Sequence, residues 1–204
     1  MKTIVFGGTG DVGQIIVNRL INQKEQVCVL TRQSKESTDN LIYMIGNVLD
    51  FRTIEKCINE GDNVIIALGF NDSNLDTMSR GTSNIISAMI NNKSKRLICL
   101  SAQGAGDSWD YMPDSFKDMV TNNSILKASF YDHGLQEELI KKSELDWTIV
   151  RPTEIIDKPA TKTYTIDCPS DSSIFQISKY DVAEFITTEL FEKRYIQQIV
   201  MITD

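Results

Sequence analysis

The sequence has little of what most metal, nucleic-acid and membrane sites require. It contains one histidine and no Cys-x-x-Cys pair, so we expect no metal site. The formal net charge of −7 at pH 7 argues against nucleic acid as a partner, because that partner needs a basic face. Hydrophobic runs are too short to cross a membrane, so we expect no membrane partner either.

Paired cysteines and targeting signals are also missing. The four cysteines are widely spaced, and we expect buried free thiols at Cys28, Cys57, Cys99 and Cys168. After Lys2 the chain runs directly into a strand-like segment and a glycine turn, whereas a signal peptide needs a longer apolar region and a cleavage site. We therefore expect a cytoplasmic protein.

Strand-like and helix-like patterns alternate along the chain and predict a single α/β domain over residues 1–204. Several strands are continuously apolar, which is typical of a parallel sheet covered by helices on both faces. Right-handed crossovers then give a Rossmann-type doubly wound sheet. Strands are predicted at 2–6, 26–31, 41–45, 63–68, 96–101, 147–150 and 198–202, and helices near 12–23, 50–59, 79–92, 123–143 and 179–193.

Two segments interrupt this alternation. Residues 104–122 are polar and rich in glycine and aspartate, and residues 152–178 are rich in proline, serine and threonine. Both follow predicted strand ends, at the sheet edge where open α/β folds bind ligands. We expect long loops there that contact the substrate.

The most informative motif is the glycine turn after the first strand. Residues 7–13 read Gly-Gly-Thr-Gly-Asp-Val-Gly and lead directly into a helical pattern. Either Gly7 or Gly8 allows the tight turn, since glycine tolerates positive φ. Gly10 lets the backbone approach phosphates, and Gly13 lets the helix pack against the strand. Amides at the helix N-terminus then face the anion. The residues predicted to bind the pyrophosphate are Gly7, Thr9, Gly10, Asp11, Val12 and Gly13.

The end of the second strand indicates which dinucleotide is bound. A site that prefers NAD places an acidic residue there, but no carboxylate appears before Glu36. Arg32 instead offers a planar guanidinium that can pair with a 2′-phosphate. The alternative is a solvated basic residue, which is common after a strand. Together with the glycine turn, Arg32 predicts NADP(H), and NAD(H) stays open.

Two further strand ends carry residues suited to the nucleotide. Asn47 can bond the adenine amino group while Val48 flanks the ring. Alternatively, Asn47 and Asp50 cap the helix that follows. Leu68 and Gly69 end the fourth strand, where the chain can pass close to the cofactor ribose.

Five segments, in order, resemble a known family. They are TGxxG at 9–13, GNVLD at 46–50, SAQGAG at 101–106, LDWTIVRP at 145–152 and ISKYDVAEFI at 177–186. They are similar to an atypical short-chain dehydrogenase/reductase of the NAD(P)H-binding, NmrA-like group, on the branch that includes biliverdin IXβ reductase/flavin reductase. The resemblance covers essentially the whole chain. It implies a Rossmann fold with an NADP site, and it implies that Pro152 and Thr153 border the nicotinamide.

The catalytic pair of typical short-chain dehydrogenases is missing. Those enzymes use Tyr-x-x-x-Lys, and this spacing does not occur in the sequence. In the matching region Ser129 stands at the Tyr position and His133 at the Lys position, which argues against alcohol-dehydrogenase chemistry. An extended conjugated acceptor needs no tyrosine acid, because it can take hydride and collect its proton from solvent.

The candidate catalytic residues are therefore Ser101 and His133. Ser101 ends a strand and can donate a hydrogen bond to the acceptor, while His133 can bond the nicotinamide ribose or relay a proton. The alternatives are a turn serine and a structural histidine. Aromatic residues near the substrate edge can either stack on a planar acceptor or pack the loops. These residues are Trp109, Tyr111 and Tyr131.

Three functions are consistent with these residues. The first is an NADPH-dependent reductase of a flavin, quinone or similar planar small molecule. The second is an NmrA-like redox sensor that binds NADP(H) without turnover and signals through a partner. The third, a sugar-nucleotide epimerase or dehydratase, is disfavoured because it normally needs the missing tyrosine and a larger C-terminal domain. The sequence does not predict an oligomeric state.

Overall fold

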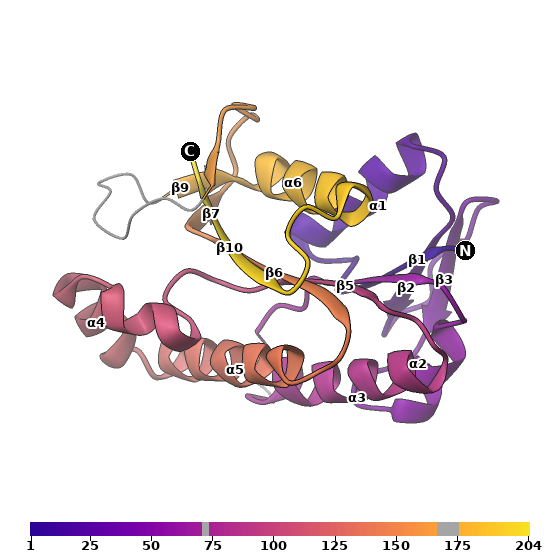
Figure 1. Ribbon diagram of the computed structural model, residues 1–204, viewed down its shortest axis with the longest axis horizontal. Coiled ribbons are helices and arrows are strands. Elements are labelled where there is room, and N and C mark those ends of the chain that lie inside the picture. Colours follow the sequence, from indigo (N-terminus) through magenta and orange to yellow (C-terminus); the bar gives the residue numbers. More distant parts are fainter. Residues whose placement is uncertain (71–73, 167–175) are drawn as a thin grey trace.

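Apolar strands form a largely parallel sheet at the centre of the molecule (Figure 1). The computed structural model describes residues 1–70, 74–166 and 176–204. Within these residues the strand order is β3-β2-β1-β4-β5-β6-β10-β8, and only β8 runs antiparallel to its neighbour. The strands are β1 (Thr3–Phe6), β2 (Val27–Thr31), β3 (Leu41–Ile45), β4 (Asn63–Ile66), β5 (Arg96–Leu100), β6 (Asp146–Pro152), β8 (Thr165–Ile166) and β10 (Gln198–Thr203).

This strand order confirms the predicted doubly wound fold and locates its ligand-binding edge. The chain runs outward from β1 to β3 and then returns to place β4 on the other side of β1. Ligands bind beyond the carboxyl ends of the strands at such a reversal. The glycine turn follows β1 directly and therefore lies at that point.

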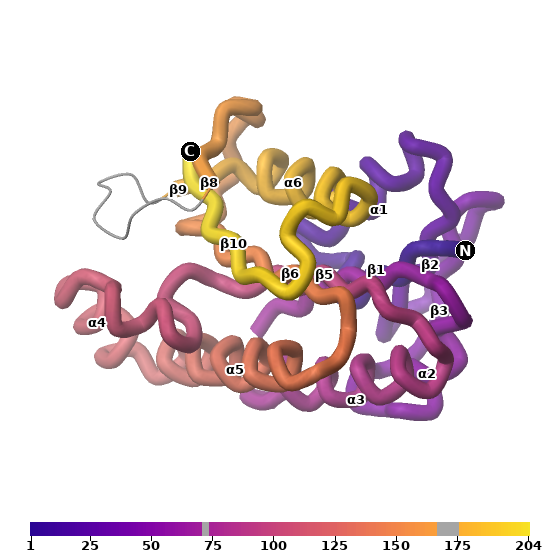
Figure 2. The backbone as a smooth tube through the Cα atoms, viewed as in Figure 1, coloured from indigo at the N-terminus to yellow at the C-terminus, as the bar shows by residue number. Residues whose placement is uncertain are grey.

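Helices cover both faces of the sheet, as the apolar strands require. In Figure 1, α1 (Asp11–Asn22) and α6 (Lys179–Glu192) lie above the sheet. Below it lie α2 (Phe51–Cys57), α3 (Thr77–Asn91) and α5 (Ser124–Lys141). Figure 2 shows the same layers as a continuous tube, with the N-terminus at the right and the C-terminus at the upper left.

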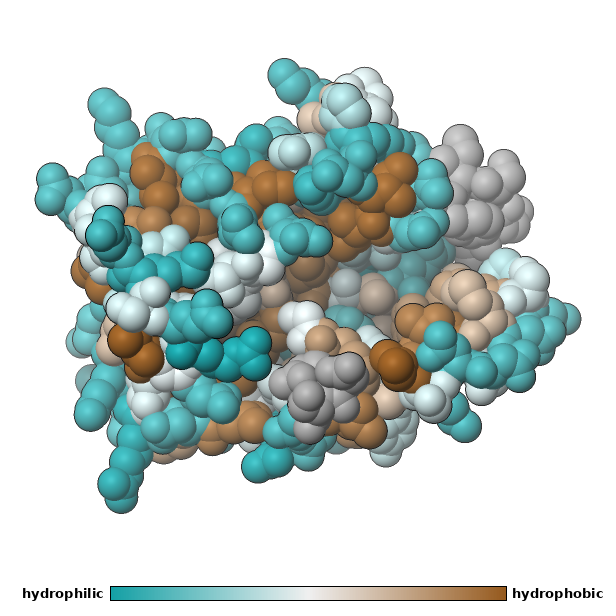
Figure 3. Space-filling model, turned by 180° about the vertical axis from the view of Figure 1, so that it is seen from behind, coloured by the Kyte–Doolittle hydropathy of each residue, from teal (hydrophilic) through white to brown (hydrophobic). Residues whose placement is uncertain are grey.

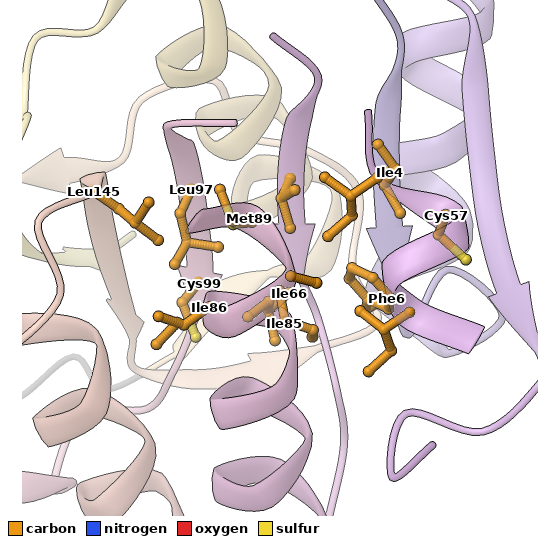
Figure 4. Close-up of a cluster of buried hydrophobic side chains, with 14 of the residues drawn as sticks. Ile4, Phe6, Cys57, Ile66, Ile85, Ile86, Met89, Leu97, Cys99 and Leu145 are labelled. Carbon is orange, nitrogen blue, oxygen red and sulfur yellow. The ribbon is translucent and has the colours of Figure 1, made fainter. Parts of the chain in front are cut away.

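The core beneath the sheet is built from strand residues that meet one face of α3 (Figure 4). Ile85 and Met89 are one helical turn apart, so both point from α3 toward the strands. Fully burying a side chain of this size stabilises the fold by roughly 1.5–3 kcal/mol. The labelled side chains that meet here include Ile4, Phe6, Ile66, Ile85, Ile86, Met89, Leu97 and Cys99.

Polar contacts attach α5 to α3. The Asp132 carboxylate on α5 accepts hydrogen bonds from the backbone N–H groups of Met78 (2.9 Å) and Ser79 (3.1 Å), in the first turn of α3. One turn later, Gln136 donates to the Thr82 hydroxyl at 2.9 Å. A carboxylate at a helix N-terminus satisfies orphan donors and complements the helix dipole. Asp132 therefore has a structural role that joins two helices.

The segment 104–122 is not the loop that we expected. It contains a 3₁₀-helix η1 (Gly106–Tyr111) and α4 (Asp114–Thr121). Phe116 of α4 packs edge-to-face with Trp109 and Phe130, at centroid distances of 6.3 and 5.4 Å. These aromatic contacts give a short polar-looking segment an apolar side to bury, which composition alone did not reveal.

The predicted loop 152–178 contains short strands that were also not predicted, and its residues 167–175 lie outside the described residues. The strands β7 (Glu154–Ile156) and β9 (Gln176–Ser178) pair in parallel, and β8 extends the main sheet. The remaining helices and strands agree with the sequence patterns to within a few residues at their ends.

The cysteines within the described residues are free and buried, as expected; they are Cys28, Cys57 and Cys99. Burial raises the pKa of the Cys99 thiol well above its ordinary value, so this thiol stays protonated and unreactive. Cys168 lies outside the described residues. Among the described helices, none combines the length and apolar character needed to cross a bilayer.

Candidate functional site

The glycine turn adopts a conformation that only these glycines allow. Gly7 has a φ of +85°, and a Cβ atom there would lie 2.1 Å from the carbonyl oxygen of Ala67. A Cβ atom on Gly13 would lie 2.1 Å from the carbonyl oxygen of Gly7. Gly7 is thus the turn residue, and Gly13 lets α1 pack against the strand end, as predicted. Gly8 instead packs against the Val29 side chain.

Gly10 differs from these glycines because the protein does not crowd it. A Cβ atom there would meet only the Gly7 carbonyl oxygen, at 3.4 Å, which is an ordinary contact. Gly10 precedes α1, and no side chain among the described residues caps that helix. The first amides of α1, which begins at Asp11, are therefore available to an anion such as a pyrophosphate.

A cleft of about 390 Å³ opens beside the glycine turn. It brings together eight of the predicted cofactor residues: Gly7, Thr9, Gly10, Arg32, Asn47, Val48, Leu68 and Gly69. Asp11, Val12 and Gly13 belong to the first turn of α1 next to it but do not line it. The cleft suits the adenosine half of a dinucleotide, because its lining residues come from the phosphate turn and from the ends of β2 and β3.

The far end of this cleft carries the residues that would distinguish nucleotides. The Arg32 side chain is exposed after β2, with no hydrogen bond or ion pair to another described residue. Its guanidinium is thus free to pair with a phosphate. At the opposite wall, a Cβ atom added to Gly69 would meet no other atom within 4 Å, so the chain there leaves space for a ligand.

Asn47 and Asp50 have separate roles, although the sequence left both as possible caps. Asp50 is the N-cap of α2 and accepts a hydrogen bond from the backbone N–H of Arg52 at 3.1 Å. The Asn47 amide oxygen accepts from the backbone N–H of Leu49 at 3.0 Å and does not cap the helix. Val48 is buried against Gly81 of α3. The loop is thereby held open toward the cleft.

A second cavity, of about 640 Å³, lies at the carboxyl ends of β5 and β6. Ser101, Pro152 and Thr153 line it, so three residues that the sequence places near the nicotinamide do come together. Most of the remaining wall is apolar and comes from α4, α5 and β7. The apolar side chains are Met112, Pro113, Phe116, Met119, Leu126, Phe130 and Ile155. In Figure 3 the molecule is hollowed between its upper and lower halves, with brown and pale surface beside the hollow.

Behind Ser101 lies a buried ionic cluster that the sequence analysis missed. The Ser101 hydroxyl donates to the Glu137 carboxylate at 2.6 Å, and Arg151 Nε donates to the same oxygen at 2.9 Å. Arg151 Nη2 also contacts the second oxygen of Glu137 and the carboxylate of Asp107. Donation from Ser101 to an acceptor would therefore require its bond to Glu137 to break. A charged residue inside the apolar strand that ends in Pro152 was the available signal, because a buried charge needs a partner.

The two carboxylates determine the electrostatics of this cluster. Burial alone would lower the pKa of Arg151, but hydrogen bonds and opposite charge from Glu137 and Asp107 outweigh burial and raise it. The hydrogen bond from Arg151 in turn lowers the pKa of Asp107. Asp107 belongs to η1, so the cluster ties that segment to the end of β6.

His133 lies on α5 but lines neither the nucleotide cleft nor the Ser101 cavity. Its Nδ1 atom is 3.4 Å from the amide oxygen of Gln136, and burial lowers the pKa of its imidazole. The structure thus does not bring His133 to the same cavity as Ser101. A role for His133 at the nicotinamide ribose remains a prediction.

The three aromatic residues proposed to stack on an acceptor lie elsewhere. Tyr111 is exposed, and Trp109 and Tyr131 line a separate open groove of about 740 Å³ between η1, α4 and α5. Phe116 and Phe130 provide the aromatic walls of the Ser101 cavity instead. The larger groove lacks Ser101 and the end of β6, so the smaller cavity is the better acceptor site.

Comparison with known proteins agrees with this geometry. The model of a family described as NAD(P)H-binding matches residues 7–193. A UDP-glucose 4-epimerase from Rickettsia akari is 27% identical over 156 residues, which are 65% of this chain and 46% of that protein. The homologous enzyme from Rickettsia rickettsii is 27% identical over 127 residues, 51% of this chain and 37% of that protein. The chain thus spans less than half the length of these curated relatives.

Solved structures with the same fold cover nearly the whole chain. ChuY from Escherichia coli O157:H7, described as an anaerobillin reductase, has a TM-score of 0.84 at 18% identity, covering 99% of this chain and 96% of that one. The oxidoreductase ylbE from Lactococcus lactis has a TM-score of 0.84 at 20% identity, covering 99% and 90%. A short-chain dehydrogenase/reductase from Veillonella parvula, solved with NADP, has a TM-score of 0.82 at 16% identity, covering 100% and 94%.

Proposed function

This chain belongs to the NAD(P)H-binding family, as its resemblance to atypical short-chain dehydrogenases/reductases implied, and we propose that it is an NADPH-dependent reductase. The acceptor is a flavin, a quinone or a similar planar conjugated molecule. The observation that carries the proposal is the apolar cavity of about 640 Å³ at the ends of β5 and β6, beside the strand ends that border the nicotinamide in this fold.

The residues of the cleft fit a dinucleotide. Gly10 and Gly69 leave space where a ligand backbone would pass, and the first amides of α1 have no side-chain cap among the described residues. Arg32, Asn47 and Val48 all line the cleft, where Arg32 would hold a 2′-phosphate and Asn47 and Val48 would contact the adenine. When bound, NADPH supplies a hydride to the acceptor and becomes NADP⁺.

The protein contributes binding and orientation rather than an acid. Pro152 and Thr153 line the acceptor cavity and would border the nicotinamide, and the apolar walls would exclude water from the acceptor. Ser101 lines the cavity with its hydroxyl oriented by Glu137. A proton from solvent completes the reduction, which is consistent with the absence of Tyr-x-x-x-Lys from the sequence. The reductase described above and the neighbour solved with NADP support this proposal.

The test is steady-state oxidation of NADPH with a panel of flavins, quinones and tetrapyrroles. We expect turnover with at least one acceptor. Tight binding of NADPH with no turnover across the panel would contradict the reductase and favour a redox sensor that binds NADP(H). The epimerases are weaker guides, because the chain lacks their usual tyrosine motif and covers less than half of their length.

Nucleotide preference has its own test. Replacing Arg32 with alanine should raise the dissociation constant of NADPH about 10–100-fold and leave that of NADH unchanged, because only NADPH carries the 2′-phosphate. Arg194→Ala is the matched control, since Arg194 is exposed and pairs with Glu192 before β10. An equal loss of affinity for NADPH and NADH in Arg32→Ala would contradict the assignment of Arg32 to the 2′-phosphate.

A further inference from the structure

Charge is unequally distributed between the two sites. The nucleotide cleft is lined by Arg32, which suits an anionic ligand. Among the described residues that line the Ser101 cavity, Glu154 is the one charged side chain. It is exposed at the start of β7 and accepts a hydrogen bond from Gln176 at 3.0 Å. The acceptor cavity therefore offers a negative rim and no cation.

The nearest buried cation is not available to a ligand in this cavity. Arg151 immediately precedes Pro152 of the cavity wall, but its side chain is 5% exposed and bonded to Glu137 and Asp107. Two carboxylates face one guanidinium, so the cluster behind Ser101 is negative overall. An anionic substituent on the acceptor would meet further negative charge there.

The segments outside the described residues add no positive charge. Residues 71–73 and 167–175 contain no lysine, arginine or histidine, and their charged residues are aspartates. Whatever they contact, they bring no group that could pair with a phosphate or a carboxylate.

The hydroxyls of Ser101 and Thr153 in the cavity wall are already engaged. The Ser101 hydroxyl donates to Glu137, and the Thr153 hydroxyl donates to Thr203 at 3.0 Å. An anion loses strong hydration when it enters an apolar cavity, and that loss must be offset by cations or by free donors. Among its described lining residues this cavity offers no cation, and the donors that remain are the neutral side chains of Gln103 and Ser115. Neutral conjugated rings lose little hydration and gain contact with Phe116 and Phe130.

We propose that the acceptor is an uncharged, apolar conjugated ring, of the quinone class, and that the cavity discriminates against anionic acceptors. The proposal rests on the reductase function above. Flavin mononucleotide and tetrapyrroles that carry carboxylates fall into the disfavoured class. Hydride from NADPH and a proton from solvent convert the quinone to its hydroquinone, so electrons and protons balance.

The experiment compares 1,4-naphthoquinone with its 2-sulfonate. The sulfonate withdraws electrons and makes the ring the better hydride acceptor, so intrinsic reactivity favours the anion. We nevertheless expect kcat/KM to be at least about tenfold higher for the neutral quinone, because the sulfonate enters the cavity without a partner. Equal values, or a preference for the sulfonate, would overturn the proposal.

A charge reversal at the rim sharpens this test. Glu154→Lys should reduce the preference for the neutral quinone about tenfold by supplying the missing cation. Glu60→Lys is the matched control, since it makes the same change at an exposed site before β4, at the opposite sheet edge, and should leave the ratio unchanged. An unchanged ratio in Glu154→Lys would also count against the proposal.

A binding measurement separates this proposal from the function on which it rests. Equilibrium dialysis of the NADP⁺-loaded protein with 2-naphthamide and 2-naphthoate compares one shape with and without charge, and it needs no turnover. We expect the amide to bind at least about tenfold more tightly. If no acceptor is reduced, the reductase function fails while this result still decides the charge preference. Equal binding, or no binding of either ligand, overturns the preference.

Discussion

Two buried arginine–glutamate pairs lie at opposite ends of the central strands. They differ in the other groups that donate hydrogen bonds to the glutamate carboxylate. Arg96 begins β5 and pairs with Glu189 of α6, whereas Arg151 near the end of β6 pairs with Glu137 of α5. All four side chains are at most 5% exposed. Burial is thus equal in the two pairs, and the partners make the difference.

The Arg96 pair contacts only fixed parts of the fold. Its carboxylate accepts backbone N–H groups from Arg194 and Tyr195, and its guanidinium donates to the Thr148 hydroxyl at 2.8 Å. Burial outweighs the hydrogen bond and charge of Glu189 and the charge of Asp146, and it lowers the pKa of Arg96. This pair joins α6 and the following turn to the sheet, at the amino ends of the strands and opposite the edge where this fold binds ligands.

The Arg151 pair instead reaches the acceptor cavity. Glu137 holds the Ser101 hydroxyl, and the second carboxylate, Asp107, lies on η1 and is 68% exposed. Hydrogen bonds and opposite charge, first from Glu137 and then from Asp107, raise the pKa of Arg151 in spite of burial. An Arg–Glu pair thus stabilises the fold at one edge of the sheet, and a second one positions Ser101 at the other. Replacing the glutamate should therefore mainly reduce stability in the first pair and mainly reduce turnover in the second.

The largest effect is expected at the structural pair. Glu189→Ala leaves Arg96 buried without a counter-charge, which should reduce the free energy of unfolding by about 3–5 kcal/mol. Urea titration measures this loss. The NADPH dissociation constant of the remaining folded protein should not change, because Glu189 lies at the edge away from the nucleotide. A variant that is as stable as wild type would show that this pair does not hold the fold.

Glu137→Gln should have the opposite pattern, with a small loss of stability and a larger loss of turnover. The amide keeps the shape and an acceptor oxygen, and Arg151 keeps Asp107, so we expect a loss of only about 1–2 kcal/mol in unfolding free energy. Because Ser101 loses its charged partner, kcat should fall about tenfold with the acceptor while the NADPH dissociation constant stays constant. Steady-state kinetics and nucleotide titration separate these outcomes. Parallel losses in binding and turnover would indicate a structural role like that of Glu189.

The contrast also explains which parts of the fold and of the site could be predicted from the sequence. Motifs that depend on local spacing were informative: the glycine turn and the strand ends gave the fold and most of the residues around the nucleotide cleft. Glu137 was missed because its role depends on Ser101 and Arg151, which are close to it only after folding. Arg151 stood inside a quoted motif, but a charged strand residue does not name its partner.

The same limit applies to the acceptor cavity. Its walls come from α4, whose apolar side is defined by Phe116 packing between Trp109 and Phe130. Composition alone predicts a polar loop there. The contacts that bury its apolar side join residues on three different elements, so they cannot be read from the local sequence. Trp109 and Tyr131 were expected near a planar acceptor from their sequence positions, yet they face another groove.

A smaller effect is expected from the exposed member of the site cluster. Asp107→Asn leaves the Arg151–Glu137 pair intact, so stability should change by no more than about 0.5 kcal/mol. It weakens the tie between η1 and β6, and KM for the acceptor should rise about two- to threefold as the cavity wall loosens. Acceptor titration at saturating NADPH measures this. A tenfold fall in kcat would instead mean that Asp107 supports Ser101 as strongly as Glu137 does.

The smallest effect concerns pH, and it distinguishes the two regions because the chain has a single histidine, His133, on the same helix as Glu137. Burial lowers the pKa of His133, while the Gln136 hydrogen bond and the charges of Glu137 and Asp132 oppose that shift. The unfolded chain therefore binds a proton at a higher pH than the folded protein does. The stability that neutral His133 contributes is present above pH 6.5, the ordinary pKa of histidine in the unfolded chain. It is lost as the pH falls from there toward the lower pKa of the folded protein.

Unfolding free energies at about pH 7.5 and about pH 5.5 test this in wild type and His133→Gln. Wild type should lose more stability over that interval than the variant. At the lower pH the unfolded wild-type chain gains a proton on His133, which the folded protein binds less readily, whereas the variant has no such group. The Glu189→Ala variant should keep the wild-type pH dependence, since its change lies in the region without a histidine. An equal loss in wild type and His133→Gln would show that acid sensitivity arises outside the site region, and the two buried pairs would then differ in their contacts but not in their response to pH.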